Sequence, residues 1–198
     1  MASELAREGY RVCLADFDLQ FGDVCHFLKL QPEKTLADLQ RTMQVEGDSC
    51  RAEDFLTPYE REGVHFDVLA APKLLEEAYN IHHEYAVRAV RNLQPHYDYI
   101  LVDMASMFST LNLAMLDLST SVTFLGIVDF LPTIKNMKIG MDTLKTLGYD
   151  KNKIRLVLNR SDAKTRIRLA DVQNLLGEPF YHVLPNDFRA ASTSIRDG

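Results

Sequence analysis

The sequence lacks the pattern that most directly marks a phosphate-binding loop. No Gly-x-x-x-x-Gly-Lys-Ser/Thr segment occurs, and none of the glycines in the 198 residues is followed by lysine. In such a loop, backbone N–H groups cradle the phosphates of a nucleotide and the lysine reaches them. The sequence therefore lacks the strongest single element of a nucleotide site.

Cysteine, clustered basic residues and long apolar runs are also scarce. The three cysteines, at positions 13, 25 and 50, form no Cys-x-x-Cys pair, and an odd number cannot pair fully, which predicts reduced thiols. A net charge of −6 with dispersed Lys and Arg argues against a general nucleic-acid surface. No apolar stretch reaches the roughly 18 to 20 residues that span a bilayer, and no leader pattern opens the chain. These absences predict a soluble, cytoplasmic protein.

The composition is that of a globular protein, with 46% hydrophobic and 25% charged residues, and we expect a single domain over residues 1–198. Short apolar runs alternate with segments of helical periodicity. This alternation predicts an α/β fold with a mostly parallel, doubly wound sheet covered by helices on both faces. The predicted strands are residues 11–16, 65–70, 99–103, 121–128, 154–159 and 181–184. The run at 99–103 is apolar except at its end, which predicts a central strand.

Three predicted helices carry their own start or stop signals. Thr35 followed by Asp38 is a variant of the capping box. Apolar residues recur at helical spacing between residues 131 and 147, and Gly148 is placed to end that helix. A further helix runs through residues 169–176 and stops at Gly177.

Two predicted strands end in acidic residues. Asp16 and Asp18 lie at the end of the first strand, and Asp103 follows the apolar run at 99–102. Ligands of open α/β sheets bind at the carboxyl ends of the strands. Carboxylates there can orient water and join a magnesium shell. The alternative for Asp16 and Asp18 is an acidic, solvated loop that turns at Gly22.

Other candidate groups have simpler explanations. His82-His83-Glu84 lacks the spacing of a zinc motif, because adjacent histidines point to different faces of a helix. No Gly-x-Ser-x-Gly elbow surrounds the hydroxyl residues after Asp103, so a loop or a helix cap is predicted there. Lys135 and Lys138 are predicted to lie on a solvated helix face.

Four segments, ADFDLQFGD, YDYILVDMAS, LVLNRSD and LPNDFRAASTSI, occur in this order along the chain. In their order and separations they resemble the ParA/MinD superfamily of P-loop ATPases. The resemblance is strongest to its CpaE/TadZ branch, which is associated with assembly of Flp (tight-adherence) pili. It covers nearly the whole chain and implies a P-loop NTPase-like sheet.

The resemblance implies a role for each matching residue, with ATP and Mg²⁺ as cofactors. Asp18 is placed to activate the hydrolytic water, and Asp16 belongs with it to the catalytic switch I segment. Magnesium is held by Asp103, through water, together with Asp16. Four residues of the last two segments contact the adenine or its surroundings: Asn159, Arg160, Pro185 and Asn186.

The chain also departs from the family. A family member begins with a strand, a Lys-Gly-Gly-x-Gly-Lys-Thr loop and most of a helix, of which MASELAREG matches only the end. We therefore expect a longer native protein, with a last helix after Gly198 and, in many relatives, a receiver-like domain at the N-terminus. The missing strand is expected in the middle of the sheet, beside the strands ending at Asp16 and Asp103. Cooperative folding of the 198 residues, with these two strands directly paired in a hydrogen-exchange experiment, would contradict the expectation of a longer protein. Alone, the chain as given is expected to bind ATP poorly and to be inactive.

The resemblance implies a nucleotide-dependent, dimerising switch ATPase that assists pilus assembly and its cellular placement. Its implied partners are ATP, a second copy and the pilus secretion ATPase or other Flp components, without nucleic acid. Its implied location is the cytoplasm, at the cell pole or the inner face of the membrane, with peripheral membrane association. A catalytically degenerate scaffold is the first alternative, since Asp103 is followed by Met-Ala-Ser instead of Pro-Pro-Gly. A DNA-segregating ParA-type ATPase is the second, which the acidic charge balance disfavours.

An apolar patch follows Asp103, at the place where the family dimerises. It comprises Met104, Met107, Phe108, Leu111 and Leu113. These side chains either pack beneath the sheet or form an interface whose exposure depends on nucleotide.

Overall fold

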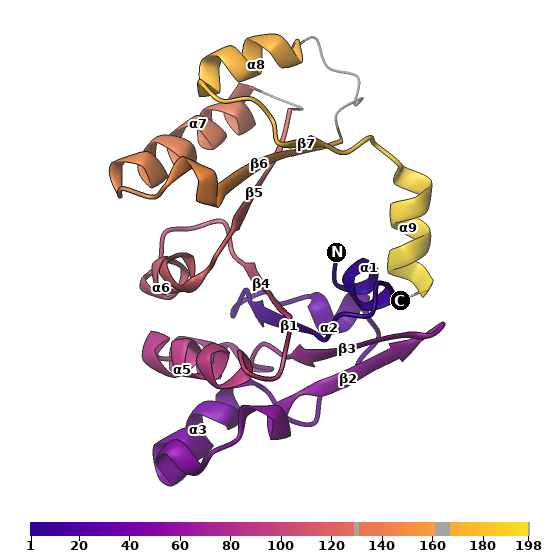
Figure 1. Ribbon diagram of the computed structural model, residues 1–198, viewed down its shortest axis with the longest axis vertical. Coiled ribbons are helices and arrows are strands. Elements are labelled where there is room, and N and C mark those ends of the chain that lie inside the picture. Colours follow the sequence, from indigo (N-terminus) through magenta and orange to yellow (C-terminus); the bar gives the residue numbers. More distant parts are fainter. Residues whose placement is uncertain (129–130, 161–166, 198) are drawn as a thin grey trace. The chain divides into compact units, whose positions relative to one another are not determined.

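The computed structural model describes residues 1–128, 131–160 and 167–197. The chain, for which the sequence predicts one domain, divides into two compact units. Unit 1 comprises Met1–Leu118 together with the end of the chain from Ile195, and unit 2 comprises Ser119–Ser194. Figure 1 labels most helices and all the described strands of both units along the chain.

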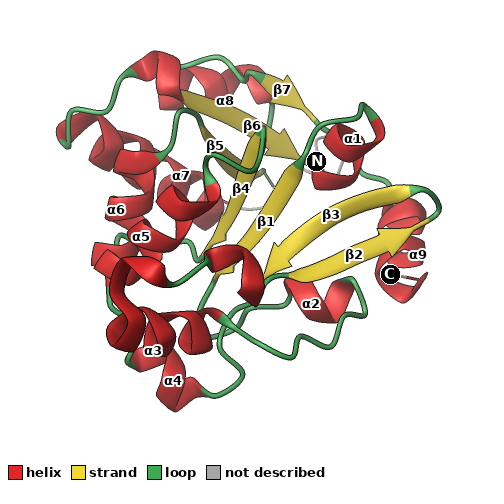
Figure 2. Ribbon diagram, turned by 60° about the horizontal axis from the view of Figure 1, so that its bottom comes forward, coloured by secondary structure: helices red, strands yellow, loops and turns green. Residues whose placement is uncertain are grey.

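Unit 1 is built on a four-stranded sheet with the order β2-β3-β1-β4. Strand β1 runs parallel to both of its neighbours, β3 and β4, while β2 is antiparallel to β3, as Figure 2 shows. The strands are β1 (Val12–Phe17), β2 (Thr57–Arg61), β3 (Val64–Leu69) and β4 (Tyr99–Met104). The helices are α1 (Ala2–Arg7), α2 (Val24–Phe27), α3 (Leu36–Glu46), α4 (Leu75–Tyr79), α5 (His83–Leu93) and α6 (Thr110–Leu118), with short 3-10 turns at Gly47–Ser49 and Ala52–Phe55.

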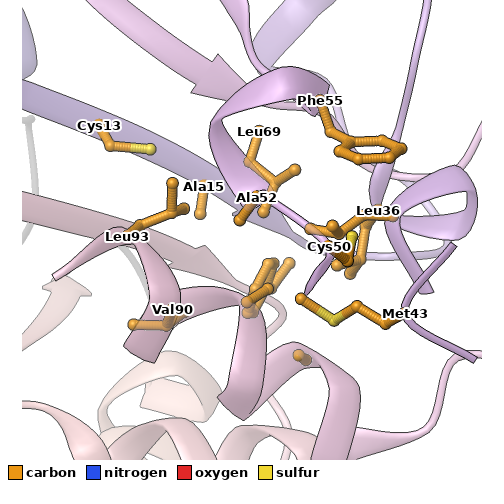
Figure 3. Close-up of a cluster of buried hydrophobic side chains, with 14 of the residues drawn as sticks. Cys13, Ala15, Leu36, Met43, Cys50, Ala52, Phe55, Leu69, Val90 and Leu93 are labelled. Carbon is orange, nitrogen blue, oxygen red and sulfur yellow. The ribbon is translucent and has the colours of Figure 1, made fainter. Parts of the chain in front are cut away.

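Helices cover both faces of this sheet, as the sequence predicts. Alternate residues of β1 enter different cores, because successive side chains of a strand point to opposite faces. Cys13, Ala15 and Phe17 pack with α3, α5 and α6, in the core that Figure 3 shows. Val12 and Leu14 pack on the other face with residues of α1, α2 and β3. The first strand is therefore buried on both sides, as parallel strands usually are.

Strand β2 was not among the predicted strands. Its sequence, Thr-Pro-Tyr-Glu-Arg, is polar and contains a proline, which suits an edge strand and hides the strand pattern. It forms a hairpin with β3 through Glu62 and Gly63, whose φ angles of 50° and 76° are the left-handed values that tight hairpin turns require.

The two acid-bearing strands are direct neighbours. β1 and β4 pair in parallel from Val12↔Tyr99 to Phe17↔Met104, so no strand lies between them. At the start of the pair, the Arg11 guanidinium and backbone N–H donate to the Asp98 carboxylate at 2.8 to 3.2 Å. Among the described strands, β4 pairs with β1 alone, so the prediction of a central strand at 99–103 is wrong for this structure.

Unit 2 contains a three-stranded parallel sheet with the order β5-β6-β7. Its core is formed by one face of the strands and by helices α7 and α8. Phe124, Leu156 and Leu158 supply that face, at alternating positions of their strands. The elements are β5 (Val122–Ile127), α7 (Leu131–Thr146), β6 (Ile154–Asn159), α8 (Leu169–Leu176), β7 (His182–Val183) and a 3-10 turn at Lys151–Lys153. Helix α9 (Phe188–Asp197) begins in unit 2, and its residues from Ile195 belong to unit 1.

The predicted helix signals are confirmed. Thr35 caps α3 in a capping box with Asp38, whose carboxylate accepts the Thr35 N–H at 2.8 Å. Gly148, with φ of 82°, follows α7, and Gly177 ends α8 in the left-handed conformation. Within the described ranges, no helix combines the length and apolar character that crossing a membrane requires.

Candidate functional site

The carboxylates predicted to carry chemistry meet at the carboxyl edge of the unit 1 sheet. Asp16 and Asp103 are register partners on the adjacent strands β1 and β4, and Asp18 follows β1 by one residue. Asp16 continues the face of Val12 and Leu14, because residues two apart on a strand share a face. The sheet thus brings together the three acids that sequence reasoning selected.

Asp16 is buried and organises the loop that carries Asp18. Asp16 is only 1% exposed. Its Oδ1 accepts the Asp18 N–H and its Oδ2 accepts the Val24 N–H, each at 3.2 Å. Burial raises the pKa of Asp16 to about 6; the Val24 N–H opposes the rise and the Asp103 charge adds to it. Sequence reasoning assigned Asp16 to catalysis and to magnesium, and both assignments stay predictions. The two hydrogen bonds of the Asp16 carboxylate hold the loop that follows β1.

Gly22 lets the same loop close over the Asp16 carboxylate. A Cβ at this position would lie 2.7 and 2.9 Å from the two Asp16 oxygens and 2.6 Å from the Ala71 Cβ. The turn predicted at Gly22 therefore has a steric reason.

We expect Gly22→Ala to displace the loop and to lower the free energy of unfolding by about 1 to 3 kcal/mol, the usual cost of overpacking. Urea denaturation measures the loss. Adding Ala71→Gly removes one of the close contacts and should restore part of the stability. Equal stability of wild type and Gly22→Ala would show that the loop does not close in this way.

Near the end of β4, the negative charges of Asp18 and Asp103 repel each other. Burial raises the pKa of Asp103 first, the nearby charge of Asp18 raises it further, and the Met104 N–H lowers it. Such repulsion between carboxylates favours a bound cation. Across residues 1–128, 131–160 and 167–197, however, no set of three or more His, Cys, Asp or Glu side chains could hold a metal ion by itself. The acids therefore fit Mg²⁺, which commonly takes one or two carboxylates and completes its shell with water and phosphate oxygens.

On the side toward β3, the loop after β1 borders residues of both charge signs. An open cavity of about 420 Å³ is lined there by Asp16, Gln20, Cys25 and Lys73, among others. Burial raises the pKa of the Cys25 thiol to about 11; the Asp16 charge adds to this rise and Lys73 opposes it. Both signs of charge thus line this cavity, and its thiol stays protonated at neutral pH.

The four residues expected near adenine gather within unit 2. Asn159 ends β6, and its Oδ1 accepts the backbone N–H of Arg160 at 3.0 Å. Arg160 has a φ of 56°, a left-handed conformation that is uncommon for a residue with a side chain. The Leu184 N–H donates to the Leu158 carbonyl at 2.7 Å, which brings the loop with Pro185 and Asn186 beside the end of β6. The structure therefore forms two groups, the acids in unit 1 and the Asn159 group in unit 2.

The contacts of Ser109 and Lys138 support the simpler explanations for these residues. Ser109 precedes α6, and its Oγ accepts the Asn112 N–H at 3.1 Å, so it acts as a helix cap. Lys138 pairs with Asp142 one turn along α7, at 2.8 Å. The apolar patch after Asp103 divides in two. Met104 and Leu111 pack against the unit 1 core, whereas Met107 and Phe108 are exposed.

Sequence reasoning missed two features that shape the site. The Val24 N–H, six residues after Asp18, binds Asp16 and could not be assigned without the path of the loop. Asn112 is 4% exposed and contacts the loop after Asp103. A lone polar residue between Leu111 and Leu113 was the available signal for it.

No protein-family model matches this chain, and neither does any curated protein sequence. Solved structures do match it. The ParA family ATPase of Chlorobium tepidum TLS has a TM-score of 0.85 at 21% identity, covering 100% of this chain and 82% of that one. The cell division ATPase MinD of Pyrococcus furiosus has a TM-score of 0.77 at 18% identity, covering 99% and 78%. The septum site-determining protein MinD of Pyrococcus horikoshii OT3, complexed with Mg-ADP, has a TM-score of 0.74 at 18% identity, covering 98% and 76%.

These similarities show the fold. It is the mostly parallel α/β fold of ParA/MinD P-loop NTPase structures, as the sequence predicts. Identities near 20% say nothing by themselves of activity, which has to be argued from the residues of the site.

Proposed function

We propose that this chain belongs to an ATP- and Mg²⁺-dependent switch ATPase of the ParA/MinD type. The observation that carries the proposal is the placement of Asp16, Asp18 and Asp103 at one edge of a ParA/MinD-like sheet. The solved MinD of Pyrococcus horikoshii is a complex with Mg-ADP, which supports the same cofactors here.

In this proposal each of the three acids has a different role. Asp16 holds the loop through two backbone N–H groups, so that Asp18 is presented to orient the attacking water. Asp103 would hold magnesium through water, and the bound ion would neutralise phosphate charge. In unit 2, the Asn159 side chain recognises the base, with Arg160 beside it, and the loop with Pro185 and Asn186 packs against it.

The proposal includes a cellular role in the assembly and placement of Flp pili, within the CpaE/TadZ branch. The four segments that resemble this branch support it, since they are spread along the chain from residue 15 to residue 195. The proposed partners are a second copy and the pilus secretion ATPase or other Flp components, without nucleic acid. The proposed location is the cytoplasm, at the cell pole or the inner face of the membrane, with peripheral membrane association.

Calorimetric titration of the full-length protein with ATP, with and without Mg²⁺, tests the nucleotide part. We expect binding that depends on magnesium. Absence of magnesium-dependent binding would rule out the switch ATPase.

Asp18→Ala is expected to slow ATP hydrolysis by about 100-fold or more while sparing ATP binding, because the water loses its positioning group. Single-turnover hydrolysis and calorimetry measure the two effects separately. Asp23→Ala is the matched control, since Asp23 is an exposed acid of the same loop without an assigned role. Equal loss of binding and hydrolysis in Asp18→Ala would contradict the assigned role.

A catalytically degenerate scaffold is the alternative that a specific observation favours, namely the Met-Ala-Ser sequence after Asp103 and the lack of a Gly-Lys pair. The encoded sequence upstream of residue 1 distinguishes the two functions. A glycine-rich loop with its lysine there supports the switch, and a loop without the lysine supports the scaffold. For a DNA-segregating ATPase, a gel shift at low salt is the direct test.

A further inference from the structure

Asn112 is a buried polar residue to which the proposed mechanism gives no role. It lies near the start of α6 and is 4% exposed. Buried amides are almost always hydrogen-bonded, because an unpaired polar group costs free energy in a protein interior. The partners of Asn112 therefore indicate what the residue does.

The hydrogen bonds donated by the side chain and the backbone N–H of Asn112 lead to the loop at residues 105–109. The side-chain Nδ2 donates to the carbonyl oxygen of Ala105 at 2.7 Å and to that of Met107 at 2.8 Å. The backbone N–H donates to the Ser109 Oγ at 3.1 Å. Carbonyl oxygens only accept, so both loop contacts require the two N–H donors of the amide.

The loop that Asn112 holds is the chain that leaves Asp103. Met104 packs against the core, and the next residues turn back, with the Met107 N–H donating to the Ala105 carbonyl at 2.8 Å. Beyond the turn, Met107 and Phe108 are 58% and 44% exposed, so packing of their side chains contributes little to holding the loop. The hydrogen bonds of the Asn112 amide hold the loop instead.

We propose that Asn112 is a positioning residue for the loop after Asp103. Its two donors hold the loop in one conformation, and this fixes the direction in which the chain leaves the Asp103 carboxylate. The consequence for hydrolysis rests on the proposed ATPase function, whereas the hold on the loop does not.

The test compares Asn112→Asp with Gln40→Glu in the full-length protein. Gln40 is a matched control, because it is a buried amide of unit 1 that spans another loop. Its Nε2 donates to the Asn80 carbonyl at 2.8 Å, and its Oε1 accepts the His82 N–H at 2.8 Å. Each substitution keeps the size of the side chain and removes the amide donors. Hydrogen exchange measured by mass spectrometry reports on each loop, and steady-state kinetics report on hydrolysis.

For Asn112→Asp we expect exchange at residues 104–110 to speed up about tenfold or more, with exchange at residues 78–83 unchanged. We also expect kcat to fall about 10- to 100-fold with KM changed by less than about threefold, because the loop loses its alignment and not its substrate contacts. In Gln40→Glu the faster exchange should be confined to residues 78–83 and kcat should be unchanged. Asn112→Ser keeps one hydroxyl donor, so it should give intermediate effects and serves if Asn112→Asp does not fold.

Unchanged exchange at residues 104–110 in both Asn112 variants would overturn the proposal. So would an equal fall of kcat in Gln40→Glu, because the effect on hydrolysis would then follow from lost stability alone. Absence of hydrolysis by the wild-type protein would overturn the proposed function but not the hold on the loop, which the exchange experiment decides by itself.

Discussion

Replacement of Leu93 by alanine is expected to lower the free energy of unfolding by about 2 to 5 kcal/mol. Leu93 ends α5 with no exposed surface, in the core that also contains Cys13 and Ala15 of β1 (Figure 3). The truncation removes buried apolar contacts and leaves a cavity, since packed surroundings relax only in part. For a total stability of about 5 to 15 kcal/mol, such a loss is severe. Urea denaturation followed by circular dichroism measures it.

Leu74→Ala is the matched control for this prediction. The substitution is the same, but Leu74 is 61% exposed and belongs to the same unit. A change within about 0.5 kcal/mol is expected there, as for most surface positions. Similar losses in both variants would mean that the packing around Leu93 is not as described.

The protein is expected to lose about 2 to 3 kcal/mol of stability at Asp16 as the pH rises from about 4 to 7. Burial raises the pKa of Asp16 to about 6, whereas the unfolded chain has the ordinary aspartate value near 4. Between these values the folded protein keeps a proton that the unfolded chain has released. The contribution is therefore fully present below the unfolded pKa and is lost as the pH rises through the folded pKa.

Urea denaturation at several pH values from 4 to 7.5, for the wild type and for Asp16→Asn, isolates this effect. The difference in unfolding free energy between the two proteins cancels the other titrating groups. We expect it to shift in favour of the variant by about 2 to 3 kcal/mol across the range, because asparagine does not titrate. A difference that stays constant with pH would contradict the burial of an ionisable Asp16.

Six of the seven strands in the described residues were predictable, because each lies in a short apolar run between turn signals. The strand that was not predicted, β2, lies at an edge of its sheet, where Pro58 and charged residues interrupt the apolar pattern. Helix ends were predictable for the same reason of locality, since Thr35 bonds within its own first turn and Gly177 adopts its own left-handed angle.

The order of the strands was not predictable from such patterns. The run Tyr99–Met104 has the composition of a central strand, yet it pairs with β1 alone among the described strands. Hydrophobicity reports that both faces of a strand are covered, and it does not report which edges are hydrogen-bonded.

The acids of the candidate site were selected from sequence because each follows a strand, and carboxyl ends of parallel strands meet at one edge. Their separate roles were not predictable in that way. Asp16 and Asp18 are two residues apart with similar neighbours, yet Asp16 is buried and accepts two backbone N–H groups. Burial and hydrogen bonding from Val24 depend on the path of a loop that no local pattern specifies.

The amino-acid sequence alone therefore determined the α/β class, the positions of most elements and the set of acids, all of which rest on interactions between near neighbours in the chain. Tertiary structure alone decided the pairing of β1 with β4, the closure of Gly22 over Asp16 and the contact of Asn112 with the loop after Asp103. These features join residues whose distance and burial arise only when the whole sheet is assembled. For that reason the lack of a Gly-Lys loop was visible at once, while the role of Asn112 was not.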